Sequence, residues 1–141
     1  MRTVTLTMPG DPRGKGRPKA TARSGHVRMY ADSETVSAEH AWRWLFVHEC
    51  PGFTPHSGPV AVTVSVGHPI PASWSGKRKA RALIGEIRPG KPDLDNVVKC
   101  VVDALNHVAY DDDKRVAWIV AEKHYAESPQ TVATIEFQDE S

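Results

Sequence analysis

Apolar and polar residues alternate along several short segments in the pattern of half-buried β-strands. Residues 3–8 and 60–66 place valine, leucine or methionine at every second position, with polar or small residues between them. Residues 131–137 form a further strand after a Glu-Ser-Pro turn. Residues 115–125 begin with six consecutive apolar residues, Val116 to Ala121, which predicts a strand buried on both faces at its start.

Helical periodicity predicts three helices between these strands. The first runs from a cap at Asp32 or Ser33 to about His48. Its apolar stripe comprises Val36, Ala41, Trp44, Leu45 and Val47. Trp42 lies off that stripe and is therefore placed to face a partner. The second is a short basic helix, capped by Ser73 or Ser75, that ends near Gly85.

The third predicted helix spans residues 97–105, with Asp95 or Asn96 as its cap. Its apolar face comprises Val97, Val98, Val101, Val102 and Leu105. The order strand, helix, strand, helix, helix, strand, strand predicts one α/β or α+β domain over residues 1–141. We expect a mixed sheet of four or more strands with two to three helices.

Composition excludes several classes of protein. With 40% hydrophobic and 25% charged residues, and no apolar run of membrane-spanning length, the chain is typical of a cytoplasmic globular protein with no membrane role. The N-terminus lacks the apolar segment of a signal peptide. Cys50 and Cys100 are isolated, and the seven histidines form no HExxH pattern. A disulfide framework and a cysteine- or histidine-based zinc site are therefore not indicated.

A net charge of +1 conceals two basic segments. One falls in residues 10–30, where glycine and proline predict a loop, and the other in the short second helix. The candidate DNA contacts in these segments are Lys15, Arg17, Lys19, Arg23, Lys77, Arg78, Lys79 and Arg81. Each segment alone could equally be a solvated surface. Trp74, beside the second segment, is a weaker candidate for stacking on a base, because tryptophans are more often core residues.

Acidic residues gather around the third predicted helix. Pro92 disfavours a helical Lys91, so an extended Asp-Leu-Asp segment would point Asp93 and Asp95 to one side. Within the helix, Asp95, Lys99 and Asp103 are four residues apart and share one polar stripe. A second acidic run, residues 111–113, follows the helix. Carboxylates in this number predict a site for Mg²⁺, or Mn²⁺, in phosphoryl transfer. The alternative is a helix cap and a solvated turn.

The segment KPDLDNVVKCVVDALN followed by YDDDKRV closely resembles the signature of the RusA family of Holliday-junction endonucleases. The resemblance extends to GDPRGKGRP and PASWSGKRKARAL, and so covers most of the chain. It implies that Asp93, Asp95 and Asp113 bind Mg²⁺ and that Lys99 is functional. It further implies supporting roles for Asn96, Asp103 and Asp112, with Asp112 as the alternative to Asp113. His107 departs from the family pattern, because glycine is common at its position.

The resemblance also implies a RusA-like fold and a homodimer that cuts opposing strands of a four-way DNA junction symmetrically, in recombination and repair. Such proteins are often encoded by phages, so we expect a place at the bacterial nucleoid or in a phage-infected cell. Two alternatives stay open. One is a non-catalytic accessory protein that binds branched DNA, and the other is a nuclease for another branched DNA.

Overall fold

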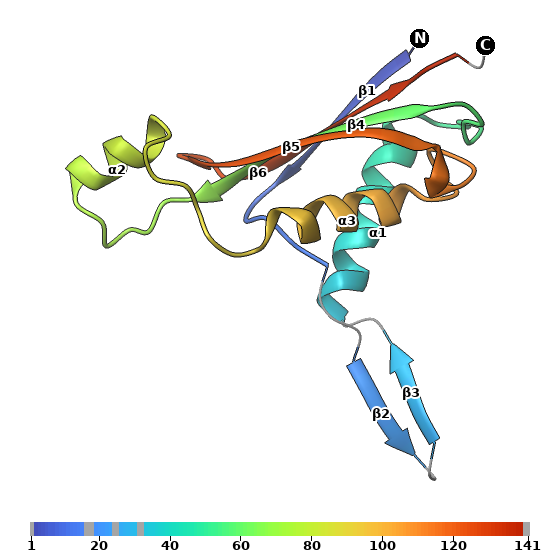
Figure 1. The fold of residues 1–141 in the computed structure, drawn as a ribbon, viewed down its shortest axis with the longest axis horizontal. Helices are drawn as coiled ribbons and strands as arrows, with labels where there is room; N and C mark the ends of the chain where they lie inside the picture. The colour runs from blue at the N-terminus through green and yellow to red at the C-terminus, as the bar shows by residue number, and fades with distance from the viewer. Residues whose placement is uncertain (1, 16–18, 24–25, 31–32, 140–141) are drawn as a thin grey trace.

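The chain folds around a mixed four-stranded sheet. A computed structural model describes residues 2–15, 19–23, 26–30 and 33–139. The strands are β1 (Arg2–Pro9), β4 (Val60–Pro69), β5 (Val116–Ala126) and β6 (Gln130–Phe137), in the order β1-β6-β4-β5. β6 pairs antiparallel with β1 and β4, whereas β5 runs parallel to β4 at the edge (Figure 1). The predicted mixed sheet and α+β class are confirmed.

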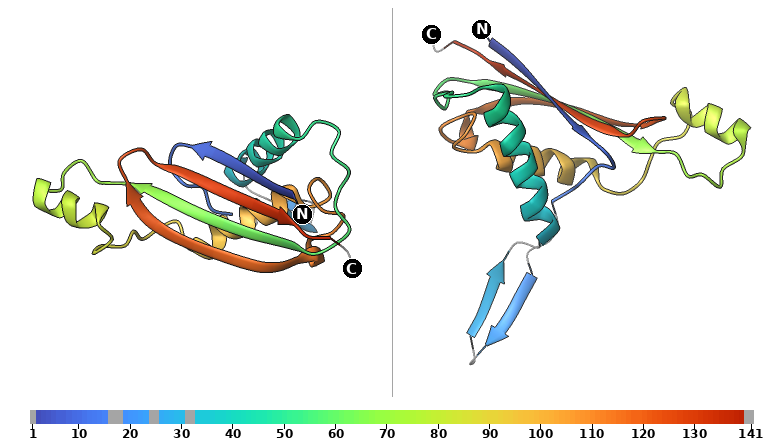
Figure 2. Two further views of the ribbon diagram at one scale, coloured as in Figure 1. Left: turned by 90° about the horizontal axis from the view of Figure 1, so that it is seen from above. Right: turned by 180° about the vertical axis from the view of Figure 1, so that it is seen from behind.

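Two helices cover one face of this sheet (Figure 2). They are α1 (Ser33–Glu49) and α3 (Leu94–Leu105), and the core lies between them and the alternating valines of β4. The parallel pairing of β4 and β5 requires a long crossover, which α2 (Gly76–Leu83) and α3 supply. Helix α2 lies beyond the end of the sheet (Figure 1). No helix in the described ranges is long and apolar enough to cross a membrane.

The buried face of α1 differs from the predicted stripe. Trp42 and Phe46 are buried in the core, whereas Trp44 and Val47 are 60% and 52% exposed. The expectation that Trp42 faces a partner is therefore wrong. Thr35, Ala38, Trp42 and Phe46 recur every three or four residues, so one small polar residue and one alanine belong to the true face. The pattern is ambiguous here, because large apolar residues occur on both faces of α1 and only packing against the sheet selects the buried one.

The predicted loop over residues 10–30 contains a β-hairpin. Strands β2 (Lys19–Arg23) and β3 (His26–Tyr30) pair antiparallel and form a separate two-stranded sheet. The hairpin extends away from the main sheet beyond the first turn of α1 (Figure 1). The sequence does contain a hairpin signal, Ser-Gly between two short runs, but the surrounding glycines and prolines obscured it.

The start of β5 is exposed, although its apolar run predicted burial on both faces. Trp118, Ile119 and Val120 are 52%, 52% and 64% exposed. The reason is topological: β5 is the edge strand, and α3 shields only part of its inner face. Ile119 pairs with buried Val62 and so belongs to the helix side of the sheet, while Trp118 and Val120 belong to the other side.

Candidate active site and nucleic-acid interface

The first two acidic residues lie at the N-terminus of α3. The helix begins at Leu94, so Asp93 is its N-cap residue and Asp95 lies in its first turn. The predicted extended Asp-Leu-Asp segment is therefore wrong, as are the predicted cap at Asp95 or Asn96 and the start at Val97. Pro92 restricts only Lys91, and the residues after a proline are free to turn helical. Negative side chains at this helix end are stabilised by the helix dipole.

Neither carboxylate of this pair is used by the fold. Asp93 makes no capping hydrogen bond with its side chain, and both residues are exposed. Lys99 follows Asp95 by one helical turn and is exposed as well. Asp95 and Lys99 border an open groove of about 650 Å³ between α3 and β5. The rest of its lining is apolar: Leu94, Val98, Val102, Ile119 and Ala121. The predicted stripe is thus present and reaches solvent beside this groove.

Asp103, the last residue of that stripe, has a different role. Its carboxylate accepts a short hydrogen bond from the Lys15 ammonium, which also lies 3.5 Å from Glu39. The hydrogen bond that Lys15 donates to Asp103 is the main cause that raises the pKa of Lys15. Asp103 lies about 12 Å along the helix axis from Asp95, too far to share one metal ion with it. Lys15, a predicted DNA contact, is engaged with carboxylates instead.

The N-terminal loop packs directly on the first turn of α3. The Lys15 backbone amide donates to the Asn96 carbonyl at 2.9 Å. A Cβ atom on Gly14 would lie 3.1 Å from the Asn96 Cβ and 3.2 Å from the Pro92 Cβ. Gly14 therefore permits a close approach that a larger residue would disturb. Asn96, a predicted supporting residue, positions this loop through its backbone.

The acidic run after α3 divides into three roles. Asp111 forms an ion pair with Arg115 at 2.8 Å, and hydrogen bonding to Arg115 lowers the Asp111 pKa. Asp112 caps the short 3-10 helix η1 (Asp113–Arg115) by accepting from the Lys114 amide, and this bond lowers its pKa. Asp113 begins η1 and is exposed. Of the two alternative ligands, Asp113 is the one that does not cap η1.

The loop between α3 and η1 is held by a buried tyrosine. The Tyr110 hydroxyl donates to the Val102 carbonyl, and burial raises the pKa of Tyr110, with a further contribution from the nearby Asp113 charge. His107 adopts a positive φ of 66° and its ring Nδ1 lies 2.7 Å from the Asp111 carbonyl oxygen. This backbone conformation explains why glycine suits the position where His107 stands.

The three predicted metal ligands do not form an assembled group. Within the described part of the chain, no three histidine, cysteine, aspartate or glutamate side chains lie close enough to hold a metal together. Asp93 and Asp95 begin α3, whereas Asp113 follows its far end. Mg²⁺, however, is commonly held by one or two carboxylates with water and substrate phosphates. The exposed pair Asp93 and Asp95 fits that mode of binding, and a closed site of three carboxylates is not formed.

Six of the predicted basic residues lie on two projecting elements, the hairpin and α2. Ser75 caps α2 by accepting from the Arg78 amide, as one of the two alternatives predicted. Lys77, Arg78 and Arg81 are exposed on α2, and Arg78 lies 4.2 Å from the ring centre of Trp74. Trp74 packs edge-on against Tyr125 of β5, so it has a packing role and also makes a cation–π contact with Arg78. Lys79 on α2 is half-buried.

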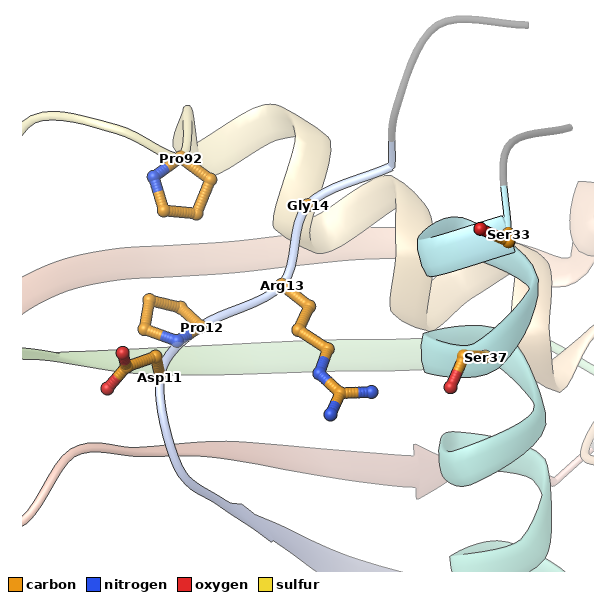
Figure 3. Close-up of a pocket in the computed structure, with 7 residues that line it drawn as sticks. All are labelled: Asp11, Pro12, Arg13, Gly14, Ser33, Ser37 and Pro92. Carbon is orange, nitrogen blue, oxygen red and sulfur yellow. The ribbon is translucent and has the colours of Figure 1, made fainter. Parts of the chain in front are cut away.

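The other basic candidates belong to the N-terminal segment. Lys19 and Arg23 begin and end β2, at the first and last rungs of the hairpin. Arg17 lies outside the described residues. A hollow of about 710 Å³ lies where this segment leaves the body, between residues 11–14, the first turns of α1 and Pro92 (Figure 3). The Arg13 side chain extends across it toward Ser37. Because Pro92 precedes Asp93, the hollow adjoins the acidic turn.

Comparison with known proteins decides the family. The sequence profile described as endodeoxyribonuclease RusA matches residues 9–136. The chain belongs to the RusA family. RusA membership supports an endonuclease that acts on DNA, and the matched range contains every predicted site residue, from Lys15 to Asp113. A relative from Bacillus subtilis (strain 168), the uncharacterized protein YqaN, is 36% identical over 138 residues, which cover 96% of each chain.

One feature beside the candidate site was not predicted. Ile119 and Ala121 supply a wall of the groove beside Asp95 and Lys99. The apolar run that contains them was interpreted as buried strand, since a sequence does not reveal which strand forms the sheet edge. The one sequence signal for this groove was Val102, an apolar residue that borders the polar stripe of α3.

Proposed function

We propose that this protein is a magnesium-dependent endonuclease that resolves Holliday junctions by paired symmetrical cuts, as a homodimer, in recombination and repair. The observation that carries this proposal is the RusA match over residues 9–136, which includes two exposed carboxylates beside a lysine on α3. We place the protein in the cytoplasm, at a bacterial nucleoid or in a phage-infected cell.

Each site residue has a distinct role in this proposal. Asp93 and Asp95 hold Mg²⁺, or Mn²⁺, and Asp113 joins them when DNA is bound, with Asp112 as the alternative. The chemistry supplied by a bound divalent ion is charge neutralisation at the scissile phosphate and a more acidic attacking water. Lys99 donates to the phosphate and stabilises its developing charge. The exposed cations of α2 and the basic residues of the N-terminal segment bind the DNA backbone.

A second candidate is an accessory protein that binds branched DNA without cutting it. The observation in its favour is that the described residues contain no assembled group of three metal ligands. A third candidate, a nuclease for another branched DNA, shares the site and differs only in substrate.

The experiment that separates the three uses the purified full chain with a synthetic four-way junction, a flap and a plain duplex, each with and without Mg²⁺. The proposed function predicts Mg²⁺-dependent cuts in opposing strands, with the four-way junction cut fastest. Binding without cleavage of any substrate would establish the accessory protein. Faster cleavage of the flap would establish the other nuclease.

A further inference from the structure

The groove between α3 and β5 exposes apolar surface where a buried core would be expected. Leu94, Val98 and Val102 are each four residues apart and form its wall on α3. Ile119 forms the facing wall and is 52% exposed, although its strand partner Val62 is only 1% exposed. Its volume of about 650 Å³ falls within the range of small-molecule and cofactor sites, roughly 300–1,000 Å³.

The charges around this groove suit a nucleotide. The two charged residues on its border are Lys99, whose ammonium can receive an anionic phosphate, and Asp95, a proposed metal ligand, while the walls are apolar. Helix α2, with exposed Lys77 and Arg78, packs against the far end of β5, the same strand that forms one wall. A nucleotide combines an anionic phosphate with the apolar faces of a base and a sugar. The groove and its border offer both kinds of contact together.

We propose that this groove holds the base and deoxyribose of a nucleotide that flanks the cut, so that Ile119 and Val102 determine base preference there. The inference rests on the proposed endonuclease, because the same groove is bordered by Asp95 and Lys99. A base that leaves the stack at a branch point exchanges stacking for contact with apolar side chains. Side chains of different size or polarity then favour different bases.

The chain contains a matched pair of residues for the test. Ile119 and Val120 are adjacent, apolar and exposed, but Ile119 lines the groove and Val120 belongs to the opposite side of the sheet. Ile119→Asn removes the apolar wall, Ile119→Phe narrows the groove, and Val120→Asn is the control. All three changes are at exposed positions, so the fold should persist, which circular dichroism and thermal unfolding would verify.

The first measurement is the rate of cleavage of four-way junctions that carry each base in turn beside the cut. We expect Ile119→Asn to change the rate ratio between bases by about tenfold, the effect of one apolar contact. Ile119→Phe should slow cuts beside purines more than cuts beside pyrimidines. Val120→Asn should keep the wild-type ratios. Unchanged ratios in both Ile119 variants, or an equal change in Val120→Asn, would overturn the proposal.

A second measurement does not depend on cleavage. A junction with 2-aminopurine at the branch point should brighten when the wild type binds, because the base unstacks, and should brighten much less with Ile119→Asn. An equal rise in fluorescence with the wild type and with Ile119→Asn would also overturn the proposal. If Ile119→Asn instead lowers the sedimenting mass and leaves base preference unchanged, a second copy occupies the groove and the proposal fails. Absence of cleavage by the wild type refutes the proposed function, and the fluorescence result then decides the groove separately.

Discussion

His107 occupies a backbone conformation that costs free energy in any residue with a Cβ atom. Its φ is 66°, and its ring contacts the Asp111 carbonyl. His107→Ala should lose that hydrogen bond and keep the strain, whereas His107→Gly should lose the bond and relieve the strain. We expect the glycine variant to exceed the alanine variant by about 1 kcal/mol in free energy of unfolding. Urea denaturation measures the difference, and an alanine variant of equal or greater stability would contradict the assignment.

Cys100 is a buried thiol on the core side of the α3 helix that carries the acidic residues. Burial is the main cause that raises its pKa from 9.0 to about 11. The folded state therefore favours the neutral thiol, and the resulting stability is present below pH 9 and lost as pH rises toward 11. The free energy of unfolding should fall more steeply over that range in the wild type than in Cys100→Ala. Rapid alkylation of Cys100 in the native protein at pH 8, detected by peptide mapping, would refute this account.

Among single residues, contacts between distant segments of the chain were the hardest to predict. Asp93, Asp95 and Lys99 are exposed as a functional site requires. The interaction of Lys15 with Asp103 and Glu39 was not predicted, because it joins distant segments, with Lys15 and Asp103 lying 88 positions apart. Nothing in the local pattern around Lys15 distinguishes it from Lys19 or Arg23.

At the scale of elements, α2 is a short basic helix whose exposed cations have few partners. Arg81 forms an ion pair with Glu86, whereas Lys77 and Arg78 point to solvent and to Trp74. If Lys77 and Arg78 each contact a phosphate, replacing both with glutamine should reduce the slope of log affinity against log salt by about 2. Lys77→Arg with Arg78→Lys keeps both charges and should keep the slope. Junction binding titrated at several salt concentrations measures it, and an unchanged slope in the glutamine variant would remove α2 from the interface.

Most helices and strands could be predicted because each buries one face and exposes the other, which leaves a periodic pattern of apolar residues in the sequence. β4 alternates and lies in the sheet interior, and the apolar face of α3 packs on it as expected. β5 and α1 were less predictable. The exposure of β5 depends on its place at the sheet edge, and the face of α1 depends on which of its tryptophans meets α3 and the sheet. Both are set by tertiary packing.

At the scale of the whole molecule, the chain presents a sheet covered on one face, with two projecting elements that carry positive charge. The hairpin leaves the body beyond α1, and α2 lies beyond the end of β5 (Figure 2). The acidic turn at the start of α3 follows α2 in the chain and lies between α2 and the hairpin in space (Figure 1). The fold therefore leaves a carboxylate pair exposed between basic segments, an arrangement that suits a nuclease acting on a branched polyanion.

The homodimer of the proposed function has a direct test. Sedimentation equilibrium over a range of protein concentrations should give twice the 15.5 kDa mass of one chain. A single-chain mass at every concentration, with and without junction DNA, would contradict paired symmetrical cutting by one assembly.

The roles of the candidate site residues stay a prediction, and their arrangement differs from the one expected. Asp93 and Asp95 share the first turn of α3, but their expected convergence with Asp113 is not present in the described chain. The place of Asp113 relative to α3 depends on the loop held by Tyr110, whose conformation a residue pattern does not encode.

The most direct measurement of the central claim compares Asp95→Asn with the wild type on one four-way junction in Mg²⁺, with cleavage and binding measured together. Asp111→Asn is the matched control, because Asp111 pairs with Arg115 instead of facing the proposed site. We predict that Asp95→Asn cuts at least about a hundredfold more slowly than the wild type and binds the junction as the wild type does. Asp111→Asn should remain active. Cleavage by Asp95→Asn at the wild-type rate would contradict the account.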